Sequence, residues 1–137
     1  MDRRLGIDFG VGRIGLALGS VMAHEYRTLP YNDRTVESIA HIIDQEKIDT
    51  IVVGRPIRSQ GESGTIEPEL EQFIDALKKS IQGVSVVFSN EAFSSSEAEL
   101  QLKELGLSAS DMKKRVDQRA AMLILDQYNK EHPISVL

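Results

Sequence analysis

The chain opens on an apolar segment that reaches an acid, turns on glycines and continues as a second apolar segment. The two segments are predicted to be strands at residues 3–9 and 13–19, and Gly10-Val11-Gly12 joins them. So short a glycine-rich connection predicts an antiparallel hairpin. In the second segment small residues alternate with large ones, which leaves one face open to close approach by a helix or a ligand. Asp8 ends the first segment, and because a carboxylate beside a buried strand needs water or a partner, it is either a turn residue or a site residue.

The hydrophobic pattern after the hairpin predicts a third strand and then alternating helices and strands. A β-branched run at 49–54 is typical of a strand covered on both faces, as in a parallel sheet. Asp33 is placed to cap the first helix. The order predicts a single α/β domain over residues 1–137, with one mixed sheet and helices on its faces. The further expected elements are a strand at 24–31, helices at 34–46 and 66–81, a strand at 84–89, and helices from Ser94 to near Gly106 and at 112–130.

Composition narrows the class of protein. The chain has no cysteine, so disulfides and thiolate metal sites are excluded, and a reducing cytoplasm is the expected setting. No signal peptide and no membrane span is expected. The net charge of −5 argues against a surface coated for non-specific nucleic-acid binding. Many cations nevertheless fall near the candidate site segments, where they form either a basic rim for a phosphodiester or scattered solvated charges: Arg3, Arg4, Arg13, Arg55, Arg58, Lys113, Lys114, Arg115 and Arg119.

Three acids stand out by their position in the predicted fold. Asp8 and Glu91 each lie at the carboxyl end of a predicted strand, and ligands of open α/β sheets bind outside the carboxyl ends of the strands. Asp117 lies on or beside the apolar stripe of the last helix, four residues before Ala121. Convergence of these carboxylates would make an oxygen-only site suited to Mg²⁺ or Mn²⁺. Such ions can activate water and stabilise the leaving oxygen in phosphodiester hydrolysis.

Each of these residues also has a simpler interpretation. Asp8 can be a turn acid, Glu91 a solvated residue after a strand, and Asp117 a salt-bridge partner of Lys113 or Arg13. Lys113 and Lys114 can be a solvated helix start or a phosphate-contacting patch. The glycines of the hairpin are no phosphate loop, because no helix follows them and the G-x-x-x-x-G-K-[ST] pattern is absent.

Four motifs, taken in order, resemble the YqgF (RuvX) family, which has the ribonuclease H-like fold. The resemblance implies a five-stranded sheet whose first three strands are antiparallel, and a metal-dependent nuclease. It implies that Asp8, Glu91 and Asp117 are the catalytic, metal-binding acids, and that Arg13 and Arg55 meet substrate phosphates. From their position in the sequence, Lys113 and Lys114 are further candidates for phosphate contacts. The motifs are Ile7-Asp8-Phe9-Gly10 through Ala17, Val53-Gly54-Arg55-Pro56, Asn90-Glu91, and Val116-Asp117 with Ala120-Ala121.

The same resemblance implies processing of the precursor of small-subunit ribosomal RNA during ribosome biogenesis. We therefore expect structured RNA as the partner, no membrane, and a monomer or weak homodimer. One alternative is Holliday-junction resolution on DNA by a dimer. Another is a non-catalytic nucleic-acid-binding module of the same fold, motivated by Ala92 where the family usually has arginine. An actin-like phosphotransferase is disfavoured, because a chain of 137 residues cannot supply two lobes around a nucleotide.

Overall fold

The computed structural model describes residues 2–10, 12–55, 66–90 and 94–134, without the side chains of residues 55, 66, 67, 90, 94–96 and 114. Its elements follow the predicted order. The third strand and the strands and helices after it begin and end within a few residues of their expected limits. The elements are β1 (Arg4–Phe9), β2 (Arg13–Leu18), β3 (His24–Pro30), α1 (Thr35–Glu46), β4 (Thr50–Arg55), α2 (Ile66–Ser80), β5 (Ser85–Asn90), α3 (Ser94–Glu104) and α4 (Ala109–Glu131).

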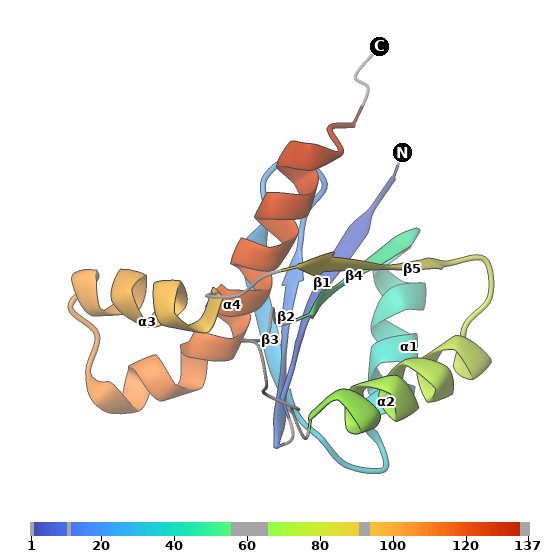
Figure 1. Cartoon of the computed structure of the whole chain (residues 1–137), viewed down its shortest axis with the longest axis horizontal. Coiled ribbons are helices and arrows are strands. Elements are labelled where there is room, and N and C mark those ends of the chain that lie inside the picture. The colour runs from blue at the N-terminus through green and yellow to red at the C-terminus, as the bar shows by residue number, and fades with distance from the viewer. Residues whose placement is uncertain (1, 11, 56–65, 91–93, 135–137) are drawn as a thin grey trace, which may run out of the picture.

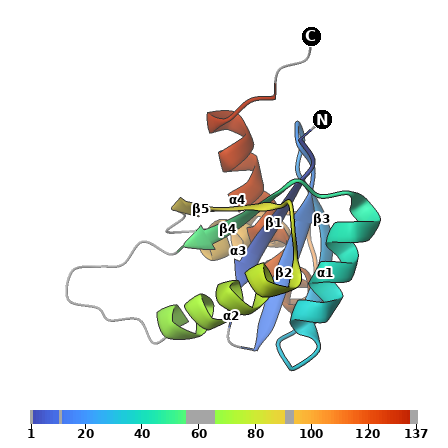
Figure 2. The same ribbon diagram turned by 90° about the vertical axis from the view of Figure 1, so that its right-hand side faces the viewer.

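The strands form one five-stranded sheet in the order β3-β2-β1-β4-β5. β1, β2 and β3 pair antiparallel, whereas β4 pairs in parallel with both β1 and β5. Helices α1 and α2 cover one face of the sheet and α4 covers the other (Figure 1). Figure 2 shows α1 and α2 in front of the sheet, whereas α3 packs beside α4, away from the sheet. The predicted mixed sheet with helices on both faces is confirmed.

Alternation along β1 divides its side chains between the two faces. Leu5, Ile7 and Phe9 belong to the larger core beneath α1 and α2, where the ring of Phe9 lies 5.1 Å from that of Phe73. Asp8 lies between Ile7 and Phe9 in the strand, so it points to the opposite face, which α4 covers. The period of two therefore places Asp8 on the α4 side.

Glycines let α4 lie very close to the sheet. A Cβ atom built on Gly6 would lie 2.9 Å from the carbonyl oxygen of Ala121, and one on Gly54 would lie 2.3 Å from Cδ1 of Ile124. The tightest approach is at Gly15, where a Cβ atom would lie 2.0 Å from the carbonyl oxygen of Asp117. The small face predicted for the first hairpin thus receives a helix rather than a ligand.

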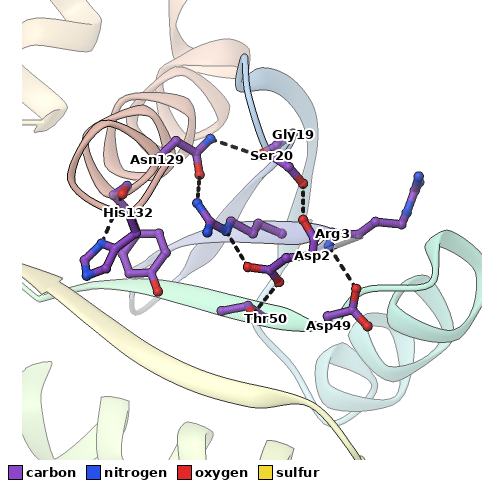
Figure 3. Close-up of polar contacts among 10 residues, drawn as sticks. Asp2, Arg3, Gly19, Ser20, Asp49, Thr50, Asn129 and His132 are labelled. Atoms are coloured by element: carbon purple, nitrogen blue, oxygen red, sulfur yellow. Dashed lines mark hydrogen bonds and ion pairs between the residues drawn. The ribbon is translucent and has the colours of Figure 1, made fainter. Parts of the chain in front are cut away.

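The last turns of α4 are tied to the start of β1 by a polar cluster around Arg4. Its members Asp2, Thr50 and Asn129 are labelled in Figure 3. The buried Arg4 guanidinium donates hydrogen bonds to Asp2 and to Asn129, each 2.9 Å long, and lies 4.9 Å from the centre of the Tyr128 ring. Burial works against ionisation of Asp2, but hydrogen bonds from Thr50 and Arg4 hold its pKa below the ordinary value. This cluster fixes the axial position of α4 along β1.

The Arg4 cluster also corrects one expectation. Arg3 and Arg4 were predicted near the candidate site, but Arg4 is the first residue of β1 and Arg3 precedes it, so both lie at the end of the strand opposite Asp8. Arg4 is buried in the contacts with Asp2 and Asn129, and Arg3 reaches Glu46 at the end of α1. Neither arginine is placed to contact a substrate at Asp8.

Two helix ends differ from prediction. The residue that caps α1 is Arg34, without a side-chain hydrogen bond, so the capping role predicted for Asp33 is wrong. The preceding turn is instead held by Asn32, which accepts from the Arg34 amide, and by Thr35. Helix α4 begins at Ala109, before the predicted start, because the Ser108 hydroxyl accepts a hydrogen bond from the Asp111 amide.

No helix in the described part of the chain is both long enough and apolar enough to cross a bilayer.

Candidate functional site

Asp8 and Asp117 lie beside each other where α4 crosses the first hairpin. Asp8 pairs with Gly15 across β1 and β2. The backbone of Asp117 rests directly on Gly15, as the 2.0 Å approach to a built Cβ atom shows. The helix therefore carries its acid over the strand neighbour of Asp8. Two residues that are far apart in the sequence form an adjacent carboxylate pair.

The surroundings of this pair disfavour negative charge. Burial, and secondarily the charge of Asp117, raises the pKa of Asp8 to about 7. Burial also raises the pKa of Asp117, although the neighbouring Arg13 guanidinium acts in the opposite direction. Two carboxylates that share a poorly solvated position gain from a cation bound between them.

Among the described side chains, Arg13 is the basic one that forms an ion pair with a member of the carboxylate pair. Its Nε atom lies 2.8 Å from Oδ2 of Asp117, and its side chain remains 45% exposed. That distance makes an ion pair, yet Oδ2 is also among the buried side-chain atoms of the described residues that lack a well-aligned hydrogen bond. We take the contact as a charge interaction whose N–H is not aimed at the oxygen. Of the two partners predicted for Asp117, the structure selects Arg13.

Of the remaining predicted site residues, the structure describes the side chain of Lys113 only. Lys113 is exposed and lines a groove together with Arg13. Glu91 and Ala92 lie outside the described residues, as do the side chains of Arg55 and Lys114. The strand before Glu91 is described: Ser89 pairs with Gly54, so the carboxyl ends of β5 and β4 lie at the same sheet edge as that of β1.

The donor set suits a hard divalent cation. Among residues 2–10, 12–55, 66–90 and 94–134, no group of three or more acids, histidines or cysteines is close enough to hold a metal ion. Asp8 and Asp117 supply carboxylate oxygens, the ligands that Mg²⁺ and Mn²⁺ prefer. The raised pKa of Asp8 and the poorly satisfied Oδ2 of Asp117 both fit a pair that is completed by a cation. The described residues thus provide two of the three predicted ligands.

A bulge in the edge strand β3 creates a contact that the sequence did not indicate. The β2–β3 register shifts between Leu16 and Ala17, so that Glu25 rather than Tyr26 lies opposite Ala17 on the α4 face. Glu25 accepts two hydrogen bonds from Arg115, which are 2.8 and 3.0 Å long, and lies 3.0 Å from Nη2 of Arg119. These arginines, for which the sequence left open a basic rim or scattered solvated charges, are instead bound to Glu25 and flank Asp117 along α4.

We expect Glu25→Gln to destabilise the chain by about 1–3 kcal/mol, because it leaves two arginines beside an uncharged amide. The expected loss is below that of a fully buried pair, since Arg115 is 38% exposed. Urea denaturation measures the change. Glu37→Gln, in the exposed first turn of α1, is the matched control and should cost only about 0.3 kcal/mol in a salt-containing buffer, because salt screens the interaction of its charge with the positive end of the helix. Equal effects of the two substitutions would show that the Glu25 contacts do not hold α4.

Solved structures of two other proteins share this fold. The structure of Thermus thermophilus RuvC in complex with a Holliday junction substrate aligns with a TM-score of 0.61 at 14% identity, covering 96% of this chain and 95% of that one. The complex of the fowlpox virus resolvase with Holliday junction DNA aligns with a TM-score of 0.58 at 9% identity, over 96% and 99% of the two chains. At these identities the likeness is one of fold alone, and it confirms the predicted ribonuclease H-like architecture.

Sequence relatives cover nearly the whole chain. A protein of Chloroflexus aggregans is 33% identical over 129 residues, 90% of each chain, and one of Anaeromyxobacter is 38% identical over 128 residues, 90% of this chain and 93% of the relative. Both bear the name "Putative pre-16S rRNA nuclease". The model of the RuvX family, described as Holliday junction resolvase, matches residues 2–131. The chain is therefore a member of the RuvX (YqgF) family, as its four motifs predicted.

Proposed function

We propose that the protein is a divalent-metal-dependent endonuclease that hydrolyses phosphodiester bonds in precursor 16S ribosomal RNA. The observation that carries the proposal is the adjacent pair of poorly solvated carboxylates, Asp8 and Asp117, beneath an exposed arginine. The names of the relatives supply the substrate class. We place this activity in the cytoplasm, which agrees with a chain that has no cysteine.

In this proposal Asp8 and Asp117 hold Mg²⁺ or Mn²⁺, with Glu91 as a third ligand. When bound, such ions activate a water molecule and stabilise the leaving oxygen. Gly15 lets α4 bring Asp117 within reach of Asp8. Arg13, exposed beside the pair, is positioned to bind a substrate phosphate while it orients Asp117. Arg55, Lys113 and Lys114 extend the proposed phosphate contacts.

The test is cleavage of a precursor 16S rRNA transcript by the full chain with Mn²⁺ or Mg²⁺, and with EDTA. We expect cleavage only with the metals, and loss of cleavage in Asp117→Asn. Asp126→Asn, farther along the same helix, is the control that should cut normally. Binding of the transcript without cleavage would contradict the proposal and favour the non-catalytic module, which Ala92 motivated.

Holliday-junction resolution is the second candidate, because the family model carries that description. A resolvase must cut two strands of a four-way junction, which requires two sites and hence a dimer. We favour a monomer or weak homodimer acting on RNA. A synthetic junction included in the same cleavage assay, together with the molar mass in solution, separates the candidates: symmetric junction cleavage by a stable dimer would replace the RNA proposal.

A further inference from the structure

A groove opens beside the carboxylate pair, between α3 and the first two turns of α4. Its volume is about 280 Å³. Figure 1 shows α3 lying against α4 on the side away from the sheet, so the groove lies outside the main core. It is lined by Arg13, Glu99, Ala109, Met112, Lys113 and Val116.

The floor of the groove is apolar and only partly covered. Ala109, Met112 and Val116 recur at helical spacing and so lie on one face of α4. Helix α3 buries Ala98 and Leu102, but Met112 and Val116 stay partly accessible. An accessible apolar strip on the side of α4 that faces away from the sheet can receive a flat apolar group.

The rim of the groove is basic on the side of the carboxylate pair. Lys113 is exposed there, and Arg13, whose Nε lies 2.8 Å from Asp117, forms part of the wall. Glu99, on α3, is the acid of the lining. The groove therefore continues directly from the site where the phosphodiester would be cut, and it offers positive charge to phosphates beside an apolar surface.

We propose that this groove binds one unstacked nucleotide of the substrate strand, next to the bond that is cut. The base lies on Met112 and Val116, while the phosphates on either side of its sugar contact Arg13 and Lys113. A nucleotide combines an apolar face with negative charge, as the lining does, and RNA is commonly recognised through bases held out of the stack. This subsite rests on the proposed nuclease function and specifies its substrate as a strand that is unpaired beside the cut.

The test measures binding by the full chain in EDTA, where no cleavage is expected. The probes are a short fluorescein-labelled single-stranded RNA and an RNA duplex of the same length. Met112→Gln keeps the length of the side chain but removes its apolar character. We expect it to weaken single-strand affinity about tenfold and to leave duplex affinity unchanged. Met22→Gln, at a position 80% exposed beyond the end of β2, is the matched control and should change neither.

Lys113→Gln tests the phosphate contact separately. It should weaken single-strand and duplex binding alike and lower the salt dependence by just under one counterion. A Met112→Gln chain that binds both probes as the native chain does, or that loses both equally, overturns the subsite. So does protection of the groove by a second copy of the chain, seen as a doubled molar mass that Met112→Gln abolishes.

Failure of the subsite and failure of the nuclease proposal give different results. If the precursor transcript is cut but Met112→Gln behaves as Met22→Gln does, the nuclease stands and the subsite is wrong. If Met112→Gln selectively weakens single-strand binding while no metal supports cleavage, the subsite stands and the nuclease proposal is wrong.

Discussion

Asp8→Asn should abolish cleavage and, in metal-free buffer at pH 8, make the chain more stable than the native protein. Burial and Asp117 raise the pKa of Asp8 from 3.8 to about 7. The folded chain therefore keeps a proton that the unfolded chain loses between these values. The unfolding free energy of the native chain should fall as the pH rises from about 4 to about 7, and the neutral asparagine should regain about 2–4 kcal/mol at pH 8.

Urea denaturation across this pH range in EDTA measures both effects. Asp75→Asn, an exposed acid on α2, is the control and should follow the native curve. Adding Mn²⁺ should stabilise the native chain at pH 8 and leave Asp8→Asn unchanged, because the substitution removes one of the proposed metal ligands. If the stability of the native chain did not vary with pH, or if Asp8→Asn were less stable than the native chain, the raised pKa of Asp8 in the carboxylate pair would be contradicted.

Gly15→Ala should displace α4 and remove Asp117 from Asp8. The new Cβ atom would lie 2.0 Å from the carbonyl oxygen of Asp117, which is backbone and cannot rotate away. Overpacking against backbone should cost at least about 3 kcal/mol. Folded Gly15→Ala protein should cleave the precursor transcript about 10²-fold more slowly than the native chain, or slower still, since displacing a catalytic group by about 1 Å has that effect.

Two other glycines make the comparison quantitative. A Cβ atom on Gly12 meets nothing within 4 Å, so Gly12→Ala should leave stability and cleavage unchanged. One on Gly54 meets the flexible end of Ile124, which can move, so Gly54→Ala should have an intermediate effect. Thermal denaturation and cleavage of the three variants give the order. If Gly15→Ala behaved as Gly12→Ala does, α4 would not rest on the hairpin as described.

The elements of this fold could be predicted because their signals are local. Three patterns predicted them, and each spans only a short stretch of sequence. They are the alternation of small and large residues in the first hairpin, the β-branched run before Gly54 and the helical spacing around Ile124. These signals also put Asp8 at a strand end and Asp117 near an apolar stripe. The Asp33 cap was wrong because Asn32 and Thr35, equally polar neighbours, hold that turn instead.

The sequence by itself thus determined the order of the elements and the strand end at which Asp8 lies, and its motifs pointed to the family. The tertiary structure alone decided which of the described cations lies beside the carboxylate pair. Arg4 is buried at the end of β1 opposite Asp8. Arg115 and Arg119 form ion pairs with Glu25, whereas Arg13 forms one with Asp117. The reason is physical: the Glu25–Arg115 contact joins residues 90 positions apart and depends on a single bulge in β3. Strand register and helix docking set such contacts, and no local pattern contains them.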